Sequence, residues 1–117
     1  MADIISYSFH DKAVRTLTDE KGGSLFCLAD VCKVLDLHQV NKTANQIKEE
    51  FELAELNSAS FDTDYGIKEF TMITEPQLYF VMMRSRVKIA REFRQWICNE
   101  VLPSLRKTGS YEIIKAK

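Results

Sequence analysis

The sequence predicts a single α+β domain, in which a small antiparallel sheet packs with several helices. Short apolar runs separated by turn residues, which are typical of strands, occupy residues 1–27 and return before Thr74. Apolar residues recur at helical spacing from Leu28 and again from Ala90. A chain of 117 residues, with 45% hydrophobic and 28% charged residues, can bury one core. We expect residues 1–109 to form this domain and residues 110–117 to form a short, frayed tail.

Three short strand-like segments open the chain. The first two are Ile4–Phe9 and Val14–Leu17. The turn residues Lys21-Gly22-Gly23 then lead into the apolar run Leu25-Phe26-Cys27. Short runs joined by turns favour a small antiparallel sheet.

Two short helices are predicted next. The buried stripe of the first, at i, i+3, i+4 and i+7, is formed by Leu28, Val31, Cys32 and Leu35. This helix is expected to end near Leu37. The second starts at Gln39, buries Val40, Ala44 and Ile47, and leaves a surface rich in amide side chains. The pair resembles a helix-turn-helix in outline.

The middle of the chain carries a predicted hairpin. Phe51–Asn57 has a pattern that fits either a strand or an extension of the preceding helix. The density of Ser, Asp and Gly predicts a hairpin loop at Ser58–Gly66, and Ile67–Ile73 is the returning strand. Residues 49–75 carry a net charge of −7. We interpret these carboxylates as a solvated edge that discourages pairing with other sheets, rather than as an acid-base site.

The best-defined helix begins at Thr74, where a capping hydroxyl is followed by a proline and, at the third helical position, by Gln77. This helix is expected to run to about Met83. Ser85 is then placed to cap a longer helix from Arg86 to Leu102. The core stripe of the longer helix consists of Ala90, Phe93, Ile97 and Val101, widened by Ile89 and Trp96. Pro103 is expected to interrupt this helix, and Gly109 to end the segment after the proline.

The charge distribution is the main functional signal. Residues 76–117 carry a net charge of +6, although the whole chain is at −1. From Arg84 to Lys107 there are seven cations and two anions, a local excess that is typical of a nucleic-acid-binding surface.

Two helices offer candidate DNA contacts. On the longer basic helix, Lys88, Arg91 and Gln95 lie opposite the core stripe, although, taken alone, this pattern favours a solvated surface with a Lys88–Glu92 pair. On the helix from Gln39, Asn and Gln side chains suit adenine edges. Which helix contacts DNA stays open. The predicted DNA-binding residues are Lys42, Asn45, Arg86, Lys88, Arg91, Arg94 and Gln95.

Catalytic and metal-binding motifs are missing from the sequence. It has no Gly-rich phosphate loop, no clustered Cys and His, and no spacing that unites His38 with Asp30 or Glu75. We expect Asp30 to cap its helix or to face solvent, and Glu75 to face the dipole of its own helix. No enzyme activity, cofactor or metal is therefore predicted.

The cysteines and the N-terminus predict a protein inside the cell. Three cysteines, Cys27, Cys32 and Cys98, are expected to be reduced thiols in or near the core. The sequence has no secretion signal and no apolar run long enough for a membrane span. We expect a soluble, cytoplasmic protein without a membrane partner.

Several segments together resemble one known domain. They are the run L-F-C-L-A-D-V-C-K-V-L-D-L from Leu25, the T-E-P-Q-L-Y helix start, S-R-V-K-I-A-R-E-F-R-Q-W-I, and E-V-L-P-S-L-R-K-T-G-S-Y. The chain resembles the BRO-N domain of viral Bro proteins and of phage or prophage antirepressors. Thr74 and Gln77 stand where the family pattern N-E-x-G-L-Y has Asn and Gly, and both preserve a helix start.

The resemblance implies an α+β, DNA-binding domain that is commonly fused to a different C-terminal domain. It also implies a role in transcription or in the choice between lysogeny and lysis, through relief of a phage repressor. Trp96, Phe93, Val101, Leu102 and Pro103 are then largely scaffold. The alternative is a protein-interaction module that binds a repressor protein or self-associates as a homo-oligomer, with acidic and basic poles paired across an interface.

Overall fold

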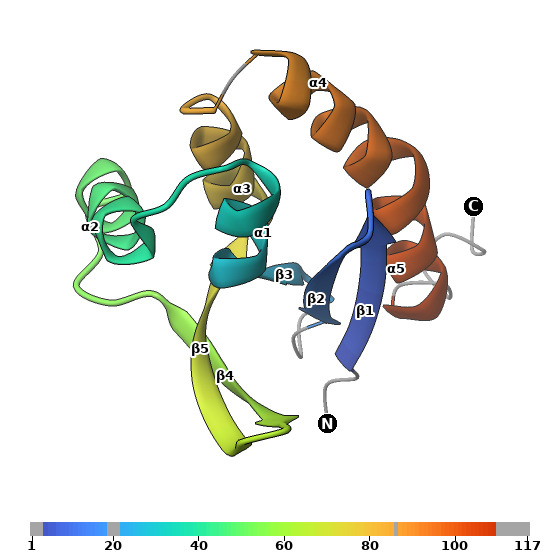
Figure 1. Cartoon of the computed structure of the whole chain (residues 1–117), viewed down its shortest axis with the longest axis horizontal. Helices are drawn as coiled ribbons and strands as arrows, with labels where there is room; N and C mark the ends of the chain where they lie inside the picture. The colour runs from blue at the N-terminus through green and yellow to red at the C-terminus, as the bar shows by residue number, and fades with distance from the viewer. Residues whose placement is uncertain (1–3, 19–21, 86, 110–117) are drawn as a thin grey trace.

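The sheet organises the molecule. The computed structural model describes residues 4–18, 22–85 and 87–109. Within these residues the strands form one antiparallel sheet in the order β1-β2-β3-β5-β4, so β1 and β4 are its edges (Figure 1). The strands are β1 (Ile4–Phe9), β2 (Lys12–Thr18), β3 (Ser24–Cys27), β4 (Asn57–Thr63) and β5 (Gly66–Thr74). The α+β class predicted from the sequence is confirmed.

Helices cover the sheet and extend beyond it. They are α1 (Leu28–Val34), α2 (Val40–Glu50), α3 (Glu75–Met82), α4 (Val87–Trp96), the π-helical turn η1 (Ile97–Val101) and α5 (Leu102–Gly109). The last three follow one another without a break. In Figure 1, α2 and α4 lie on either side of α3, and the β4–β5 hairpin extends away from the helices. This arrangement separates the hairpin from α4. No helix in the described part of the chain is long and apolar enough to cross a membrane.

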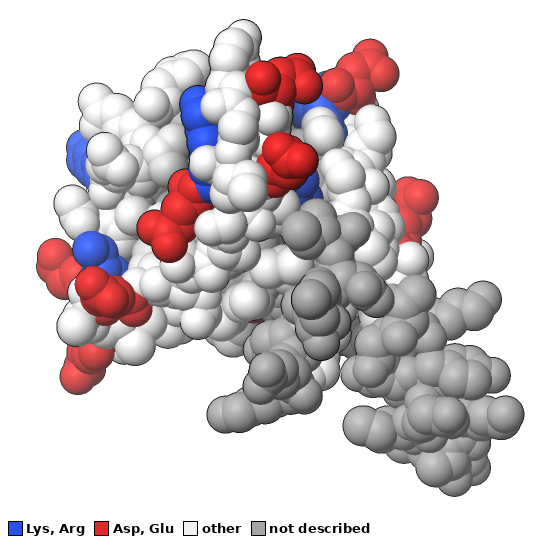
Figure 2. All heavy atoms as spheres, turned by 90° about the horizontal axis from the view of Figure 1, so that it is seen from below, with Lys and Arg blue, Asp and Glu red and all other residues white. Residues whose placement is uncertain are grey.

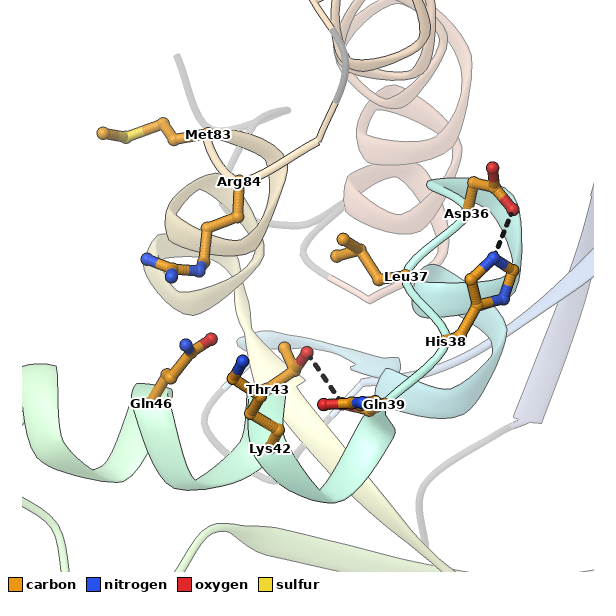
Figure 3. A pocket seen from close by; sticks show the side chains of 9 residues that line it. All are labelled: Asp36, Leu37, His38, Gln39, Lys42, Thr43, Gln46, Met83 and Arg84. Atoms are coloured by element: carbon orange, nitrogen blue, oxygen red, sulfur yellow. Dashed lines mark hydrogen bonds and ion pairs between the residues drawn. The ribbon is translucent and has the colours of Figure 1, made fainter.

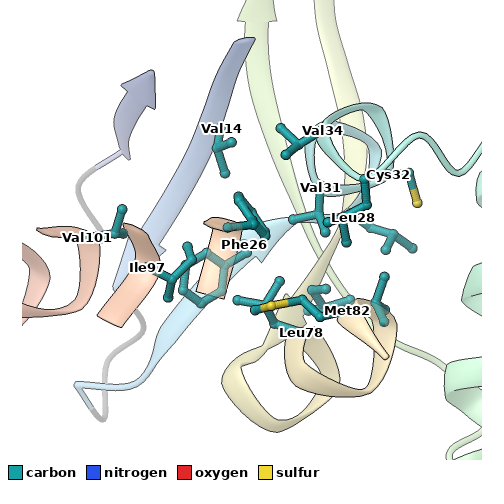
Figure 4. Close-up of a cluster of buried hydrophobic side chains, with 14 of the residues drawn as sticks. Val14, Phe26, Leu28, Val31, Cys32, Val34, Leu78, Met82, Ile97 and Val101 are labelled. Atoms are coloured by element: carbon teal, nitrogen blue, oxygen red, sulfur yellow. The ribbon is translucent and has the colours of Figure 1, made fainter. Parts of the chain in front are cut away.

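The main core lies between the sheet and the helices. Phe26 of β3 is fully buried at its centre, close to Ile97 and Leu78 (Figure 4). Phe93 of α4 is also fully buried, and Trp96 packs on Phe9 with ring centroids 5.0 Å apart. Burial of such large apolar side chains is the dominant favourable term in folding. Among the residues that the resemblance assigns to the scaffold, Phe93, Val101 and Leu102 are buried, Trp96 is half-buried, and Pro103 is exposed.

The start of α3 confirms the predicted capping box. The Thr74 hydroxyl accepts a hydrogen bond from the Gln77 backbone N–H, and the Gln77 side-chain oxygen accepts one from the Thr74 N–H at 2.9 Å. Ile73 and Leu78, on either side of the cap, are both fully buried in the main core. Local chemistry and core packing therefore agree on where this helix begins.

The predicted loop at Ser58–Gly66 is wrong. Asn57–Thr63 forms the edge strand β4, and the turn is restricted to Asp64 and Tyr65. The polar residues that suggested a loop lie on the outer, exposed side of the strand, whereas Phe61 is buried on the other side. Before β4, residues 51–56 form neither the strand nor the helix extension that the sequence allowed. Helix α2 ends at Glu50, and these residues form turns and coil.

The predicted break at Pro103 is also wrong. The helix continues through Pro103, which lies in the first turn of α5, directly after η1. In a regular helix the proline ring clashes with the carbonyl four residues earlier, here that of Asn99. Asn99 lies within η1, and the wider π-helical turn provides room for the ring. The hydroxyl of Ser85, just before α4, donates to the Leu35 carbonyl at 2.9 Å and ties this turn to the end of α1.

The three cysteines differ in exposure. Cys27 and Cys32 are buried as expected, but Cys98 is exposed on η1, which corrects its predicted place in or near the core. We expect Cys98 to react with a thiol reagent in the folded protein, and the other two only after unfolding. Burial raises the pKa of the Cys27 and Cys32 thiols, and only the thiolate is nucleophilic. Labelling followed by mass spectrometry checks this; equal rates at all three positions would contradict the burial.

Candidate nucleic-acid interface

Helix α4 presents its basic residues to solvent because its apolar stripe holds it on the core. Phe93 is fully buried and Ile89 is half-buried, whereas Lys88, Arg91 and Gln95 are exposed. The predicted division of this helix into a core side and a polar side is confirmed.

A first hollow lies between α3 and α4. It has a volume of about 540 Å³ and is lined by Tyr79, Met82, Met83, Ser85, Ala90, Arg91, Arg94 and Cys98. Arg91 and Arg94, both predicted DNA contacts, are exposed at its α4 side. Neither forms an ion pair with any carboxylate in residues 4–18, 22–85 and 87–109. Their guanidinium groups are therefore available to an external anion.

A second hollow lies between α2, the α1–α2 connection and the end of α3. Its volume is about 640 Å³, and its lining residues are Asp36, Leu37, His38, Gln39, Lys42, Thr43, Gln46, Met83 and Arg84. Figure 3 shows the Arg84 side chain directed toward α2, where Gln46 and Lys42 lie. Arg84 also lies over the Phe80 ring, with 5.7 Å between the guanidinium carbon and the ring centroid. Two cations from different elements thus meet at one hollow, beside amide groups.

Met83 joins the two hollows, since it lines both of them. Its side chain is 82% exposed at the end of α3. We call Lys42, Arg84, Arg91 and Arg94, together with Met83 between them, the basic face. The α2 and α4 surfaces, which the sequence left as separate alternatives, are therefore linked through Met83.

The predicted contact residues fall into three groups. Lys42, Arg91 and Arg94 belong to the basic face. The exposed side chains of Asn45, Lys88 and Gln95 lie on α2 or α4 but line neither hollow. Arg86 lies outside the described residues.

Sequence reasoning missed Arg84, Gln39 and Gln46 as lining residues. Arg84 belongs to the basic segment, but helical period does not select it, because it follows the end of a predicted helix rather than lying on a helix face. A cation just after an apolar helix, next to an exposed methionine, is the signal that was available. Helical period marks the two amides only as part of a polar surface.

The Lys88–Glu92 ion pair that the sequence allowed on the solvated side of α4 does not form in the described structure. Glu92 lies 3.4 Å from His10 of the β1–β2 turn, between its Oε2 and the histidine Nε2. No carboxylate in the described ranges forms an ion pair with Lys88. The acidic residue of α4 is thus turned toward β1, away from the cations of the basic face.

The carboxylates considered for catalysis have separate partners. Asp30, expected to cap its helix or face solvent, is instead 5% exposed, and its two oxygens accept from the Arg15 guanidinium at 2.8 and 2.9 Å. His38 lies 3.1 Å from Asp36 at the exposed α1–α2 connection. Glu75, the third group considered, accepts a hydrogen bond from the Tyr79 hydroxyl at 3.1 Å. The described part of the chain holds no cluster of metal-ligating side chains.

Tyr79 in the α3–α4 hollow has two polar neighbours. Its hydroxyl donates to Glu75 at 3.1 Å and lies 3.7 Å from the Cys98 sulfur. Burial, followed by these hydrogen bonds, raises the pKa of Tyr79. The phenol therefore stays neutral, and it adds no negative charge to the side of the hollow where Arg91 and Arg94 lie.

Part of the acidic segment, residues 49–75, lies away from α4. Asp62, Asp64 and Glu69 are exposed on the β4–β5 hairpin, away from α4 in Figure 1. Figure 2, a view onto the end that carries this hairpin, shows acidic side chains spread over that surface with basic groups between them. The separation of charge in space is therefore partial, because Glu50 ends α2 and Glu75 begins α3.

Comparisons with known proteins give relatives of two kinds. An uncharacterized protein of Haemophilus influenzae is 33% identical over 108 residues, which cover 92% of this chain and 52% of the relative. A protein named for a Bro-N domain, 289L of Invertebrate iridescent virus 6, is 31% identical over 103 residues, or 75% of this chain and 25% of that protein. The corresponding protein 019R of Invertebrate iridescent virus 3 is 29% identical over 123 residues, 89% of this chain and 29% of its own length.

This chain therefore spans about half of the bacterial relative and less than a third of these viral ones. No solved structure matches it. The family model described as BRO family, N-terminal domain matches residues 13–103, which include all of the sheet except β1 and Lys12, and all of the basic face. The chain belongs to the BRO family and carries its N-terminal domain, Bro-N.

Proposed function

We propose that this Bro-N domain binds DNA noncovalently through the basic face. Lys42, Arg84, Arg91 and Arg94 neutralise phosphates, and the amides of Gln39 and Gln46 are near enough to reach base edges. The observation that carries the proposal is the meeting of two hollows at Met83, with four cations that form no ion pair with a carboxylate in the described residues. Asp36, which also lines one hollow, is paired with His38.

The biological role that we propose is that of a Bro-type regulator. In this role, DNA binding in the cytoplasm of a bacterial host alters transcription or the choice between lysogeny and lysis, as in the antirepressors that the sequence resembles. No covalent chemistry, cofactor or metal takes part. Because the relatives extend well beyond the matched region, a regulatory partner such as a repressor protein is part of the proposal for the whole protein.

Salt dependence tests the DNA-binding proposal. We expect fluorescence anisotropy with random duplex DNA to show an affinity that falls steeply as salt rises. If each of the four cations replaces a counterion, the slope of log K against log salt is about −3.6 for duplex DNA. Single-stranded oligonucleotides in the same titration measure the strand preference. Absence of binding at low salt, or an affinity independent of salt, would contradict the proposal.

A second candidate function is protein interaction at the same surface. It is favoured by Met83, whose apolar side chain is 82% exposed between the two hollows. Exposed methionines suit partners of varied shape because the side chain is flexible and polarisable. The test is capture of a purified phage repressor by the domain. If Met83→Ser abolishes this capture and leaves the affinity of the domain for DNA unchanged, the result would support protein interaction over DNA binding as the function of this surface.

A further inference from the structure

The outer side of the β4–β5 hairpin combines acidic and apolar side chains. Asp62 is paired in register with Ile67, and Ser60 with Glu69, so these four side chains share one side of the hairpin. Asp64 and Tyr65 form the turn. We call Asp62, Asp64, Tyr65, Ile67 and Glu69 the hairpin tip.

The apolar members of the hairpin tip are unusually exposed. Tyr65 is 87% exposed and Ile67 is 76% exposed. On the opposite side of the same hairpin, Phe61 and Phe70 pack on the Arg15 guanidinium, with centroid distances of 5.1 and 4.2 Å. One side of the hairpin is thus anchored to the domain, whereas Ile67 projects on the other side among carboxylates and Tyr65 projects from the turn. Neighbouring apolar side chains exposed in this way are typical of a contact surface.

Charge decides which partner fits. Two hairpin tips that met each other would bring the carboxylates Asp62, Asp64 and Glu69 of both copies together, and like charges across an interface are unfavourable. Residues 62–69 contain three carboxylates and one lysine, Lys68, whose ammonium lies over the Tyr65 ring at 5.4 Å. The fitting partner is therefore a cationic surface with an apolar centre.

The basic face of the same chain has this composition. The exposed Met83 lines both hollows, which have volumes of about 640 and 540 Å³; Arg84 lines the first, and Arg91 and Arg94 line the second. The hairpin projects from the domain (Figure 1) and the basic face is hollowed, so a projection of one copy can meet a hollow of another.

We propose that the hairpin tip of one copy docks onto the basic face of a second copy. Asp62 and Glu69 pair with the arginines, and Tyr65 and Ile67 contact Met83 and enter the hollows. The contact is head-to-tail, because it joins two different surfaces, and a pair of copies therefore keeps one free basic face on the first copy and one free hairpin tip on the second. This contact does not require DNA binding. If the proposed function holds, the docked hairpin covers the DNA surface, and the two contacts exclude each other.

A charge swap tests the contact without DNA. The hairpin variant carries Asp62→Lys and Glu69→Lys, and the face variant carries Arg91→Glu and Arg94→Glu. All four side chains are exposed, so the fold is expected to be retained, and circular dichroism verifies it. Sedimentation at low salt is expected to show concentration-dependent association of the wild type, reduced at least about tenfold in each variant alone. An equimolar mixture of the two variants is expected to associate again, since the reversed charges complement each other.

Two results would overturn the inference: a wild type that sediments as a monomer at every concentration at low salt, or a variant mixture that sediments as the sum of its two components. A third variant, Tyr65→Ser with Ile67→Ser, keeps every charge and is expected to weaken association as well; unchanged association would remove the apolar part of the contact. The hairpin variant keeps its basic face, so the fluorescence anisotropy of duplex DNA with this variant measures DNA binding apart from the head-to-tail contact. Absence of DNA binding in the wild type together with a successful charge swap contradicts only the proposed function.

Discussion

Reversing Arg91 and Arg94 to glutamate is expected to lower the affinity for duplex DNA on the order of 100-fold at low salt. This loss corresponds to two charge-assisted contacts at about 1.5 kcal/mol each, before any repulsion from the new carboxylates. The slope of log K against log salt is expected to become shallower by about 2, since each lost phosphate contact removes about 1. Anisotropy titrations of both proteins across a range of salt measure the affinity and the slope together.

The matched control carries the same number of reversed charges elsewhere. Lys12→Glu with Lys33→Glu changes two exposed lysines that line neither hollow. We expect this control to weaken binding far less, through the overall charge alone. The melting temperature of both variants is expected to stay near that of the wild type, because all four side chains are exposed and Arg91 and Arg94 have no ion-pair partner in the described part. Equal losses in the two variants would show that position on the basic face does not matter.

Replacing Asp30 with alanine is expected to lower the free energy of unfolding by about 3–5 kcal/mol. The carboxylate accepts from the Arg15 guanidinium at 2.8 and 2.9 Å and from the Arg15 backbone N–H at 2.9 Å. Removing the carboxylate leaves the Arg15 guanidinium without an anion. The Arg15 side chain is only 25% exposed and packs against Phe61 and Phe70. In the intact protein this carboxylate raises the pKa of Arg15 by hydrogen bonding. Without it the arginine still keeps its charge, because a guanidinium stays protonated in proteins, so the cost is not relieved.

Urea denaturation measures this change, and two further variants define its cause. Glu92→Ala removes an exposed partner of His10, and we expect a loss of at most about 0.5 kcal/mol. Arg15→Met combined with Asp30→Leu removes both charges, and it is expected to recover much of the stability lost in Asp30→Ala, since no ion is then left unpaired. A stability of Asp30→Ala close to that of the wild type would mean that water replaces the carboxylate at Arg15.

Sequence patterns identified most of the elements because their causes are local. The capping box at Thr74, the apolar stripe around Phe93 and the β1–β3 strands depend on neighbouring residues, and the structure confirms each. Two errors in the elements have different causes. A polar segment becomes the edge strand β4 only because β5 lies beside it, which is a nonlocal cause. Pro103 continues a helix because η1 widens the turn directly before it, and helical period does not predict a π-helical turn.

The candidate site divides in the same way. The excess of positive charge after Arg84 and the polar side of α4 were evident from composition and helical period. Only the tertiary structure placed Lys42 and Arg91 around Met83, and turned Asp30 inward to Arg15. The physical reason is that period and capping depend on residues a few positions apart, whereas a shared surface depends on how α2, α3 and α4 pack over one core, which joins segments that are distant in the sequence.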